Sequence, residues 1–560
     1  MKNTNNILRF FVHPSLQGLL FLFLLCLSHL SLVAQNKVEQ KEEIKITSSF
    51  KPSIIRKGKI INYATPPEKD SSAFTFKYGA PEINTKTFVK SFTINPLDVN
   101  RNELLTDSSG FFAKAGYGNI QNPLVQLAYE NDKPNSNISV WANHVSSKGM
   151  LTDQSFANSS FGAYVDSKIS EYQKLNFNVG YNLDMYRQYG YDHALFNFTD
   201  DKLKQQFSNF HAAVSFSSIS GNEKKSIFSP LLYFSNLSTA KKANESTIAV
   251  VIPFSKQFND KMTLSIKPRM DLVFFSGSRD SSKMTSVIQL PLRASAKSTN
   301  LTLDGGFNTV LTHSGVKLLP LLDFNYTPSS SVLSLFVEIA NKASVNSFHF
   351  LSSQNPFIVT PDSITTFQEV EYNAGIKIAL KKQLLIKLSG GYANFMNLPL
   401  YLNAGLSGKD LKAVYEPVLN AFKFKAELGY TPTTHFDFKA SVIAYNLYGQ
   451  INYQKAYGFI PIELNADLSW KPIQTLKLHS KLKIWKGAWA FSESKTNHLL
   501  NNAADLNLGV EYDLNKKWGI WLDLNNIANV KYERWSQYSS YGFNVIGGIR
   551  FHLFKTKFNN

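Results

Sequence analysis

The residue types that could carry covalent chemistry are sparse in this 560-residue chain and lack the spacing that catalysis requires. The single cysteine, Cys26, lies in an apolar N-terminal run, so the rest of the chain has no disulfide and no thiolate metal site. The eleven histidines lack the paired spacing of zinc ligands. No Gly-x-Ser-x-Gly motif, which would position a nucleophilic serine, is present. We therefore expect neither an enzyme nor a protein with a cofactor or a metal.

One glycine-rich segment, Gly405-Leu406-Ser407-Gly408-Lys409, has part of the composition of a phosphate-binding loop. It lacks the first glycine at the spacing that lets backbone N–H groups surround a phosphate. Two glycines close together also suit a tight turn, because glycine adopts left-handed backbone conformations at little cost. We interpret the segment as a turn in a connection between strands.

Basic side chains are the more informative set, because the formal net charge is +18. Many occupy alternate positions of the same segments: Lys267, Arg269, Lys423, Lys425, Lys477, Lys481, Lys483 and Arg550. Rings of such side chains favour anionic solutes when they line a pore. Acidic residues share the same alternation: Asp184, Asp271, Glu427, Asp505, Glu511 and Asp523. A wall of salt bridges is therefore an equally good interpretation, and the two remain open.

The segments that carry these charges alternate apolar and polar residues, which is the period of a two-faced β-strand. The alternation is clear at 175–185, 262–272, 422–430, 476–484 and 518–525. The chain contains 43 Phe and 25 Tyr, which favour strands. Beyond the N-terminus no apolar run reaches the length of a membrane-spanning helix, so we exclude a helical membrane protein.

The last alternating segment, Tyr541–Phe554, has a period of two over more than ten residues. One face carries Phe543, Val545, Ile549, Phe551 and Leu553, and the other carries Asn544, Arg550 and His552. Ile546 is the exception to the pattern. Repeated strands with one apolar and one polar face are the signature of a transmembrane β-barrel.

The N-terminus predicts export. Lys2 and Arg9 precede an apolar run at 19–27, and residues 32–35 form a plausible cleavage site, as in a signal peptide. We expect a signal peptide at 1–35, a loosely structured periplasmic segment at 36–109, a barrel at 110–554 and a tail at 555–560. Because the chain is exported, we expect no nucleic-acid partner despite the positive charge.

The connections predict the number of strands. Ten short links, among them 131–134, 170–173 and 515–517, alternate with longer ones such as 188–206 and 392–419. Short turns face the periplasm and longer loops face outward in such barrels. The expected fold is all-β, an antiparallel up-and-down barrel of about 22 strands, within a range of about 20 to 24.

The sequence resembles TonB-dependent outer-membrane receptors, most clearly near its C-terminus. The residues that carry the resemblance are Leu522–Asn529, Tyr532, Tyr541-Gly542 and Gly547–Phe554. The segments Gly116–Asn119 and Asn143–Ser147 are similar to those of plug-poor barrel proteins of Bacteroidota. The short segment Glu43–Thr47 is similar to the box through which these receptors engage TonB by strand addition. The resemblance implies an outer-membrane location in a Gram-negative cell envelope and a role in transport.

The chain departs from these receptors before its first strand. Only about 75 residues precede the barrel in the mature chain, fewer than a folded plug needs, whereas barrels of this size have an occupied lumen. We therefore expect a plug-poor type whose lumen is closed by the N-terminal segment, by outer loops or by a partner protein. Expected partners are outer-membrane lipid and lipopolysaccharide, the barrel-assembly machinery, and TonB or a plug or lid protein.

Two functions follow. The first is a transporter or porin-like pore component for solutes, and the alternative is a structural or assembly subunit of a larger outer-membrane complex. In either case we expect the last strand to close the barrel and to act as its assembly signal. The residues assigned to that role are Phe543, Gly548, Phe551, Leu553 and Phe554.

Overall fold

The computed structural model describes residues 108–133, 135–218, 226–277, 282–329, 331–380, 383–492 and 496–556. The expected signal peptide and the segment Glu43–Thr47 lie outside these ranges, as do almost all of the expected periplasmic segment and the last four residues. Within the described ranges, neither short helix is long and apolar enough to cross a membrane.

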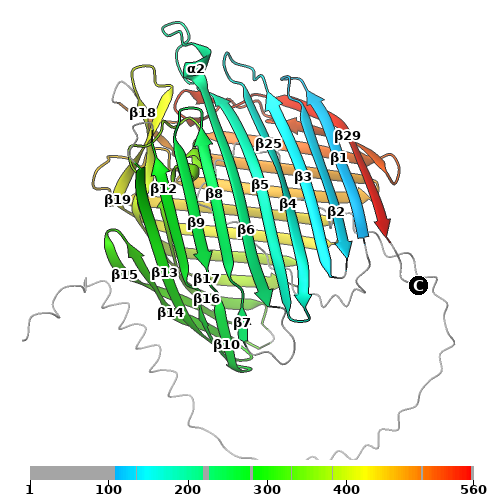
Figure 1. Ribbon diagram of the computed structural model, residues 1–560, viewed down its shortest axis with the longest axis vertical. Coiled ribbons are helices and arrows are strands. Elements are labelled where there is room, and N and C mark those ends of the chain that lie inside the picture. The colour runs from blue at the N-terminus through cyan, green and yellow to red at the C-terminus, as the bar shows by residue number, and fades with distance from the viewer. Residues whose placement is uncertain are drawn as a thin grey trace, which may run out of the picture. The chain divides into compact units, whose positions relative to one another are not determined.

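One antiparallel sheet contains most of the described residues (Figure 1). Its first half consists of β1 (Ser108–Gly118), β2 (Leu124–Lys133), β3 (Ser136–Ser147), β4 (Phe156–Ser170), β5 (Gln173–Arg187), β6 (Lys204–Ser218), β7 (Ser226–Phe228), β8 (Leu231–Thr239), β9 (Asn244–Val251), β10 (Phe254–Asn259), β11 (Met262–Ile266), β12 (Arg269–Ser276) and β13 (Ser282–Lys297). Its second half consists of β14 (Leu301–Thr312), β15 (Gly315–Tyr326), β16 (Leu333–Asn346), β17 (Thr365–Leu380), β18 (Leu384–Ala404), β19 (Asp410–Thr433), β20 (Phe436–Tyr448), β21 (Ile462–Ile473), β22 (Leu476–Lys486), β25 (Ala503–Asp513), β26 (Trp518–Asn525) and β29 (Asn544–Thr556).

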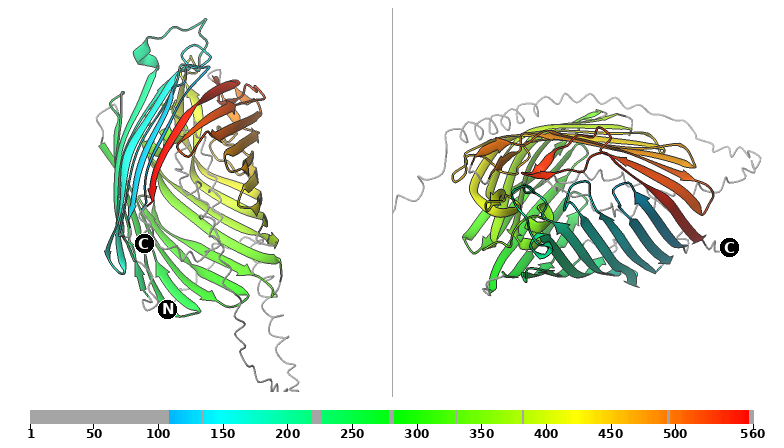
Figure 2. Two further views of the ribbon diagram at one scale, coloured as in Figure 1. Left: turned by 90° about the vertical axis from the view of Figure 1, so that its right-hand side faces the viewer. Right: turned by 90° about the horizontal axis from the view of Figure 1, so that it is seen from above.

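The sheet closes on itself, because β1 pairs with β2 on one side and with β29 on the other. The closing register runs from Ser108 opposite Thr556 to Gly118 opposite Ile546. Figure 2 shows β29, in red, beside the first strands, in blue and cyan. This closure and the resulting barrel of 22 antiparallel strands confirm the predicted fold class, strand number and closing pair.

In three of the 22 strands a proline divides the strand into two segments. Pro230 separates β7 from β8, Pro253 separates β9 from β10, and Pro268 separates β11 from β12. Proline has no N–H to donate to a neighbouring strand. The backbone carbonyls remain paired, since Ser229 donates to Pro253 at 3.2 Å and Ile252 donates to Pro268 at 2.9 Å. The prolines therefore interrupt the hydrogen-bond ladder without opening the wall.

The two faces of the wall differ as the alternation predicts. Exposed apolar side chains cover the outer face, for example Val125, Leu127, Phe161, Phe177 and Phe424. Since an unpaired backbone cannot be exposed to hydrocarbon, a closed barrel with such an apolar surface is the architecture of an outer-membrane protein.

Strands end near the predicted short links at one end of the barrel, where both β1 begins and β29 ends. At the opposite end, called the outer end below, the long connections contain α2 (Asp200–Leu203), α3 (Phe348–Gln354) and the hairpins β23 (Trp489–Phe491) with β24 (Asn497–Leu499) and β27 (Glu533–Trp535) with β28 (Tyr538–Ser539). The alternation of residues in the sequence did not predict these small elements.

The predicted long connection at 392–419 is wrong. β18 continues to Ala404 and β19 begins at Asp410, so only five residues separate two tall strands. Asn397 has a left-handed φ of 54° at an irregularity in the pairing, and two prolines lie nearby, all of which break the alternation. Both faces of β18 are buried in this region, because the strand rises beside the outer connections. A strand buried on both faces reads as a continuous apolar run.

Candidate functional site: the lumen wall and the outer lid

Four connections at the outer end pack against each other, and together they are called the lid: residues 188–203, 347–364, 405–409 and 526–543. The first joins β5 to β6, and the third joins β18 to β19. The strand pair β5 and β6 lies opposite the strand pair β18 and β19 in the ring of 22 strands. Contact between them therefore crosses the mouth of the barrel.

Polar contacts make this crossing. The Gln188 side chain donates from Nε2 to Asp410 Oδ1 at 2.8 Å and to the Phe357 carbonyl at 3.3 Å. Lys409, whose side chain is 8% exposed, donates to Asp410 Oδ2 at 2.9 Å. The hydroxyl of Tyr538 donates to the Lys409 carbonyl, which joins the fourth connection to the third. Gln188 and Tyr538 thus each bond to a residue from another part of the lid.

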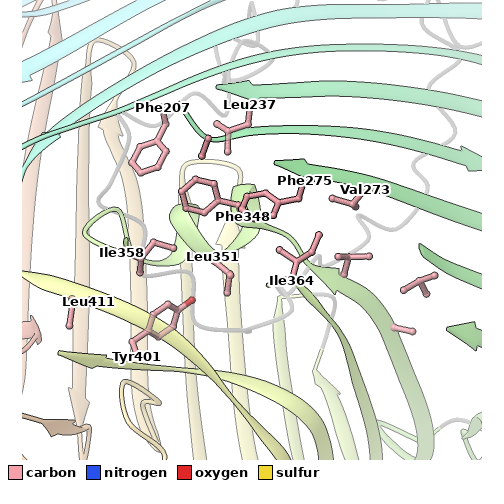
Figure 3. Close-up of a cluster of buried hydrophobic side chains, with 14 of the residues drawn as sticks. Phe207, Leu237, Val273, Phe275, Phe348, Leu351, Ile358, Ile364, Tyr401 and Leu411 are labelled. Carbon is pink, nitrogen blue, oxygen red and sulfur yellow. The ribbon is translucent and has the colours of Figure 1, made fainter. Parts of the chain in front are cut away.

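Aromatic rings fill the space beside these contacts. The rings of Phe357 and Tyr538 stack with centroids 3.8 Å apart. Tyr189 meets both edge-on, at 5.7 and 5.0 Å. Phe348, Leu351 and other side chains of the second connection continue the apolar cluster onto the inner face of the wall (Figure 3). The lid is therefore a packed core and not a set of separate loops.

Glu245 of β9 holds the lid to the wall. Its carboxylate accepts the backbone N–H groups of Phe348 at 2.5 Å and His349 at 3.1 Å, at the start of α3. The hydroxyl of Ser347 caps the same helix by accepting from Phe350 N–H. Without these acceptors the first N–H groups of the helix would be buried and unpaired.

Contacts with the lid identify the inner face of two strands, β12 and β22. Phe275 of β12 packs on Phe348 of the lid, and Trp485 of β22 packs on Tyr532. Arg269 and Asp271 lie on the same face of β12 as Phe275, because side chains an even number of positions apart share a face. For the same reason Lys477, Lys481 and Lys483 lie on the same face of β22 as Trp485. By the same alternation Lys267 lies on the face of Arg269. Lys423, Lys425 and Arg550 each form a salt bridge with an acidic residue of the wall. The use of these eight cations for solute selection stays a prediction.

Pairing of opposite charges dominates this inner wall. Arg269 bonds to Asp271 at 2.7 Å, Lys423 to Glu371 at 2.6 Å, and Lys425 to Glu427. Arg550 bonds to both Glu511 and Asp513 at 2.7 Å, and Lys483 lies 3.7 Å from Glu463. Amides and hydroxyls continue the lattice, as where Asn308 donates to Asn341 at 2.8 Å. These contacts favour the salt-bridged wall over an unpaired ring of cations.

Lys423→Met is expected to lower the free energy of unfolding by about 3 kcal/mol, because it leaves the half-buried Glu371 carboxylate without its main partner. The Lys423 side chain is 9% exposed. Thermal unfolding of the purified barrel in detergent measures the effect. The matched control is Lys439→Met, whose partner Asp437 is 41% exposed and whose loss should cost less than about 1 kcal/mol. Equal losses in the two variants would contradict this expectation.

Four of the five residues assigned to barrel closure lie in β29, and Phe543 directly precedes it as the last residue of the lid. Phe551 and Leu553 lie on the outer face of the strand, and Phe551 packs on Trp518 at 4.8 Å. Gly548 lies in the closing seam opposite Gly116. For Phe554 the structure describes only the backbone, which pairs with Gly110. Ile546, the exception in the sequence pattern, packs on the inner face with Leu124, Val145 and Trp521. The assembly-signal role of the five assigned residues stays a prediction.

Sequence reasoning missed the lid residues Gln188, Tyr189, Phe357 and Tyr538. Their signal was the density of aromatic residues in long connections, such as the three tyrosines at 186, 189 and 191. The segment at 405–409 is a turn, as predicted, with φ of 87° at Gly405 and 75° at Gly408. Among the described residues no group of three His, Cys, Asp or Glu side chains is arranged to hold a metal ion.

Comparison with solved structures agrees with this architecture. The FrpB iron transporter from Neisseria meningitidis matches with a TM-score of 0.63 at 11% identity, over 80% of this chain and 82% of that one. A ferric enterobactin receptor from Pseudomonas aeruginosa matches with a TM-score of 0.59 at 10% identity, over 80% of each chain. The barrel has the fold of TonB-dependent receptors. The copper transporter OprC matches similarly, with a TM-score of 0.60 at 10% identity over 80% of this chain and 81% of that one.

No family model and no curated protein matches the sequence, so the similarity to these proteins is a similarity of structure. It confirms the resemblance predicted from the last strands.

Proposed function

We propose that this protein is an outer-membrane transport barrel in which the lid is the outer gate. The observation that supports this is the contact between Gln188 and Asp410, which joins opposite sides of the mouth. Behind the lid the wall carries a continuous set of charged, amide and hydroxyl groups, which suits a hydrated solute better than a lipid. Solute would enter when the lid opens and leave at the periplasmic end.

Interactions of the lid are of a kind that can reverse. They consist of hydrogen bonds, ion pairs and the packing of aromatic and apolar side chains, with no disulfide, because the only cysteine is Cys26. The proposal has two further parts. TonB energises the opening of the lid, and a plug or lid partner or residues 36–109 also occupy the lumen. The barrel-assembly machinery and lipopolysaccharide are its expected partners during insertion and in the membrane.

Conductance in planar lipid bilayers tests the proposal. The full chain is expected to give rare, brief openings, because the lid is closed. A variant lacking residues 36–107, which keeps the whole of β1, is expected to open at least as often. Both forms should insert to the same extent, judged by the shift in gel mobility between heated and unheated samples. Silent bilayers with both forms, and also with the lid variants described in the Discussion, would rule out a pore.

The alternative function, a structural or assembly subunit of a larger outer-membrane complex, draws support from the outer connections. Leu195, Leu406 and Ile451 are apolar and 65% to 86% exposed at or near the lid. Such side chains favour contact with another protein. Purification in mild detergent separates the two functions, since a stoichiometric partner lost in a Leu406→Asp, Ile451→Asp variant supports the complex. A single chain whose conductance is unchanged by this variant supports the transporter.

A further inference from the structure

A small cavity of about 40 Å³ lies under the lid on the inner side of the wall. Its floor and sides come from three barrel strands, through Phe395 and Tyr401 of β18, Tyr445 of β20 and Glu463 of β21. Its roof comes from Arg534 and Trp535 of β27, with Gly458–Ile460 from a neighbouring connection. The cavity therefore lies where the lid meets the lumen wall.

Several polar groups at this cavity are buried and make no hydrogen bond within the described part of the chain. They are Arg534 Nε and Nη1, the Tyr401 hydroxyl and Trp535 Nε1. Burial without a partner costs about 1 to 3 kcal/mol for each such group, and more for a charged one. A folded protein rarely leaves several donors unsatisfied in one place unless an acceptor from elsewhere completes them.

The charge at the cavity also favours an acceptor. Burial lowers the pKa of Arg534 to about 10, while Tyr401 and Glu463 act in the opposite direction. The guanidinium therefore stays protonated at neutral pH. Its central carbon, Cζ, lies over the Trp535 ring, 3.9 Å from the centroid, and this contact does not use the N–H donors. Glu463 is engaged elsewhere, since it accepts from Asn465 at 2.8 Å and lies 3.7 Å from Lys483.

We propose that the cavity binds a compact anion, with the guanidinium fork of Arg534 on the anion and the Tyr401 hydroxyl and Trp535 N–H as further donors. A volume of about 40 Å³ accommodates a carboxylate-sized group and not a whole large solute. Phe395, Phe459 and Tyr445 give the cavity aromatic sides, and surroundings less polar than water strengthen charge-assisted bonds. The ligand class is thus a carboxylate borne by a solute, or a free inorganic monoanion of similar size.

This inference concerns binding alone and does not rest on transport. If the anion binds but no conductance is seen, the proposed function fails and the anion site stands. If the barrel conducts but no anion binds, the anion site fails and the transporter stands.

Thermal unfolding of the full chain in detergent tests the site, with sodium formate, acetate and chloride compared at equal ionic strength. A ligand that binds only the folded barrel raises the unfolding temperature in proportion to the logarithm of its concentration. The wild type is expected to unfold several degrees higher in saturating formate. Arg534→Gln should lose the whole shift, and Tyr401→Phe should weaken apparent binding about tenfold, because it removes one donor and keeps the ring.

Arg187→Gln is the matched control. Arg187 also lies at the outer end, but its guanidinium bonds to Asp153 at 2.7 Å and to Asp200 at 2.6 Å. This variant should keep the full formate shift even if its unfolding temperature falls. Gel mobility of unheated samples establishes that each variant is folded, and Arg534→Lys offers a second test because it keeps the charge and loses the fork.

The comparison of anions separates the two sources. A larger shift with formate and acetate than with chloride indicates a carboxylate site, and equal shifts that vanish in Arg534→Gln indicate a general monoanion site. Both results support the inference. Absence of any shift in the wild type, or an unchanged shift in Arg534→Gln, would overturn it.

Discussion

Replacing Gly548 with valine is expected to abolish accumulation of the folded barrel in the outer membrane. Gly548 faces Gly116 across the closing seam of β29 and β1. A Cβ on Gly548 would overlap the Ala115 carbonyl oxygen and the Gly116 backbone, which cannot move without breaking the seam. Because every other strand is already paired, loss of this one pairing leaves two unpaired edges in hydrocarbon.

The inner side of the seam explains why glycine occurs on both strands. The Trp521 ring lies over Gly116, where an added Cβ would overlap it. Lys114 Nζ covers the ring at 3.9 Å from its centroid, and Trp521 Nε1 donates to the Ile549 carbonyl at 3.3 Å. The indole thus packs on backbone at the place where the barrel closes.

Gly305→Val is the control for Gly548→Val. Gly305 lies within β14, in the same barrel, but an added Cβ there meets nothing within 4 Å. Outer-membrane fractions and the heat-dependent gel shift measure accumulation and folding of the two variants. We expect the Gly305 variant to resemble the wild type. Normal insertion of the Gly548 variant, or equal loss in both, would refute the role assigned to the seam.

The wall could be predicted from the sequence because each strand reports its own environment. Lipid on one side and polar groups on the other impose period two, and the short links separate one strand from the next. Leu175, Phe177 and Val179 illustrate this, since their alternation with asparagine and glycine is enough to place them on one face. The closing pair followed from topology, because a barrel with no exposed edge must join its first strand to its last.

The lid could not be predicted in this way because its contacts join residues far apart in the chain. Gln188 meets Asp410, and Tyr189 meets Tyr538 and donates to the Ser539 carbonyl at 2.8 Å. No local pattern relates such residues. The same is true of the buried donors around Arg534, which become significant only when the fold places Tyr401 and Trp535 beside them.

The error at 392–419 has a related cause. There the strands rise beside the lid and are buried on both faces, so the residues no longer alternate. Leu398, Leu400 and Leu402 are all buried, together with the intervening Tyr401. Apolar and polar residues stop alternating where both faces of a strand are buried, so such a strand cannot be recognised by its two-residue period. A failure of the pattern within an otherwise regular barrel therefore marked the region that packs against the candidate gate.

Phe357→Ala is expected to open the lid. Phe357 is 4% exposed and stacks on Tyr538 while its carbonyl accepts from Gln188. Truncating a buried phenylalanine costs about 3 to 5 kcal/mol, and each 1.4 kcal/mol changes an equilibrium constant about tenfold. If the closed lid alone bears a loss of about 3 kcal/mol, the ratio of open to closed barrels rises about 100-fold. Open probability in planar bilayers measures this ratio.

Tyr538→Phe provides a graded second variant, because it keeps the stacked ring and removes only the hydroxyl that donates to the Lys409 carbonyl. The net loss of one such bond is about 0.5 to 1.5 kcal/mol, so the open probability should rise only about 2- to 12-fold. Leu406→Ala is the control, since Leu406 is 86% exposed within the lid and makes little contact to lose. Its open probability should equal that of the wild type.

The order of these three variants distinguishes a gate from a general loss of stability. The unfolding temperature of the barrel should change little in each, because the wall strands retain their pairing and the lid opens as a separate unit. Open probability should rise in the order Leu406→Ala, Tyr538→Phe, Phe357→Ala. A fall in unfolding temperature without a change in open probability would mean that the aromatic contacts stabilise the barrel and do not gate it.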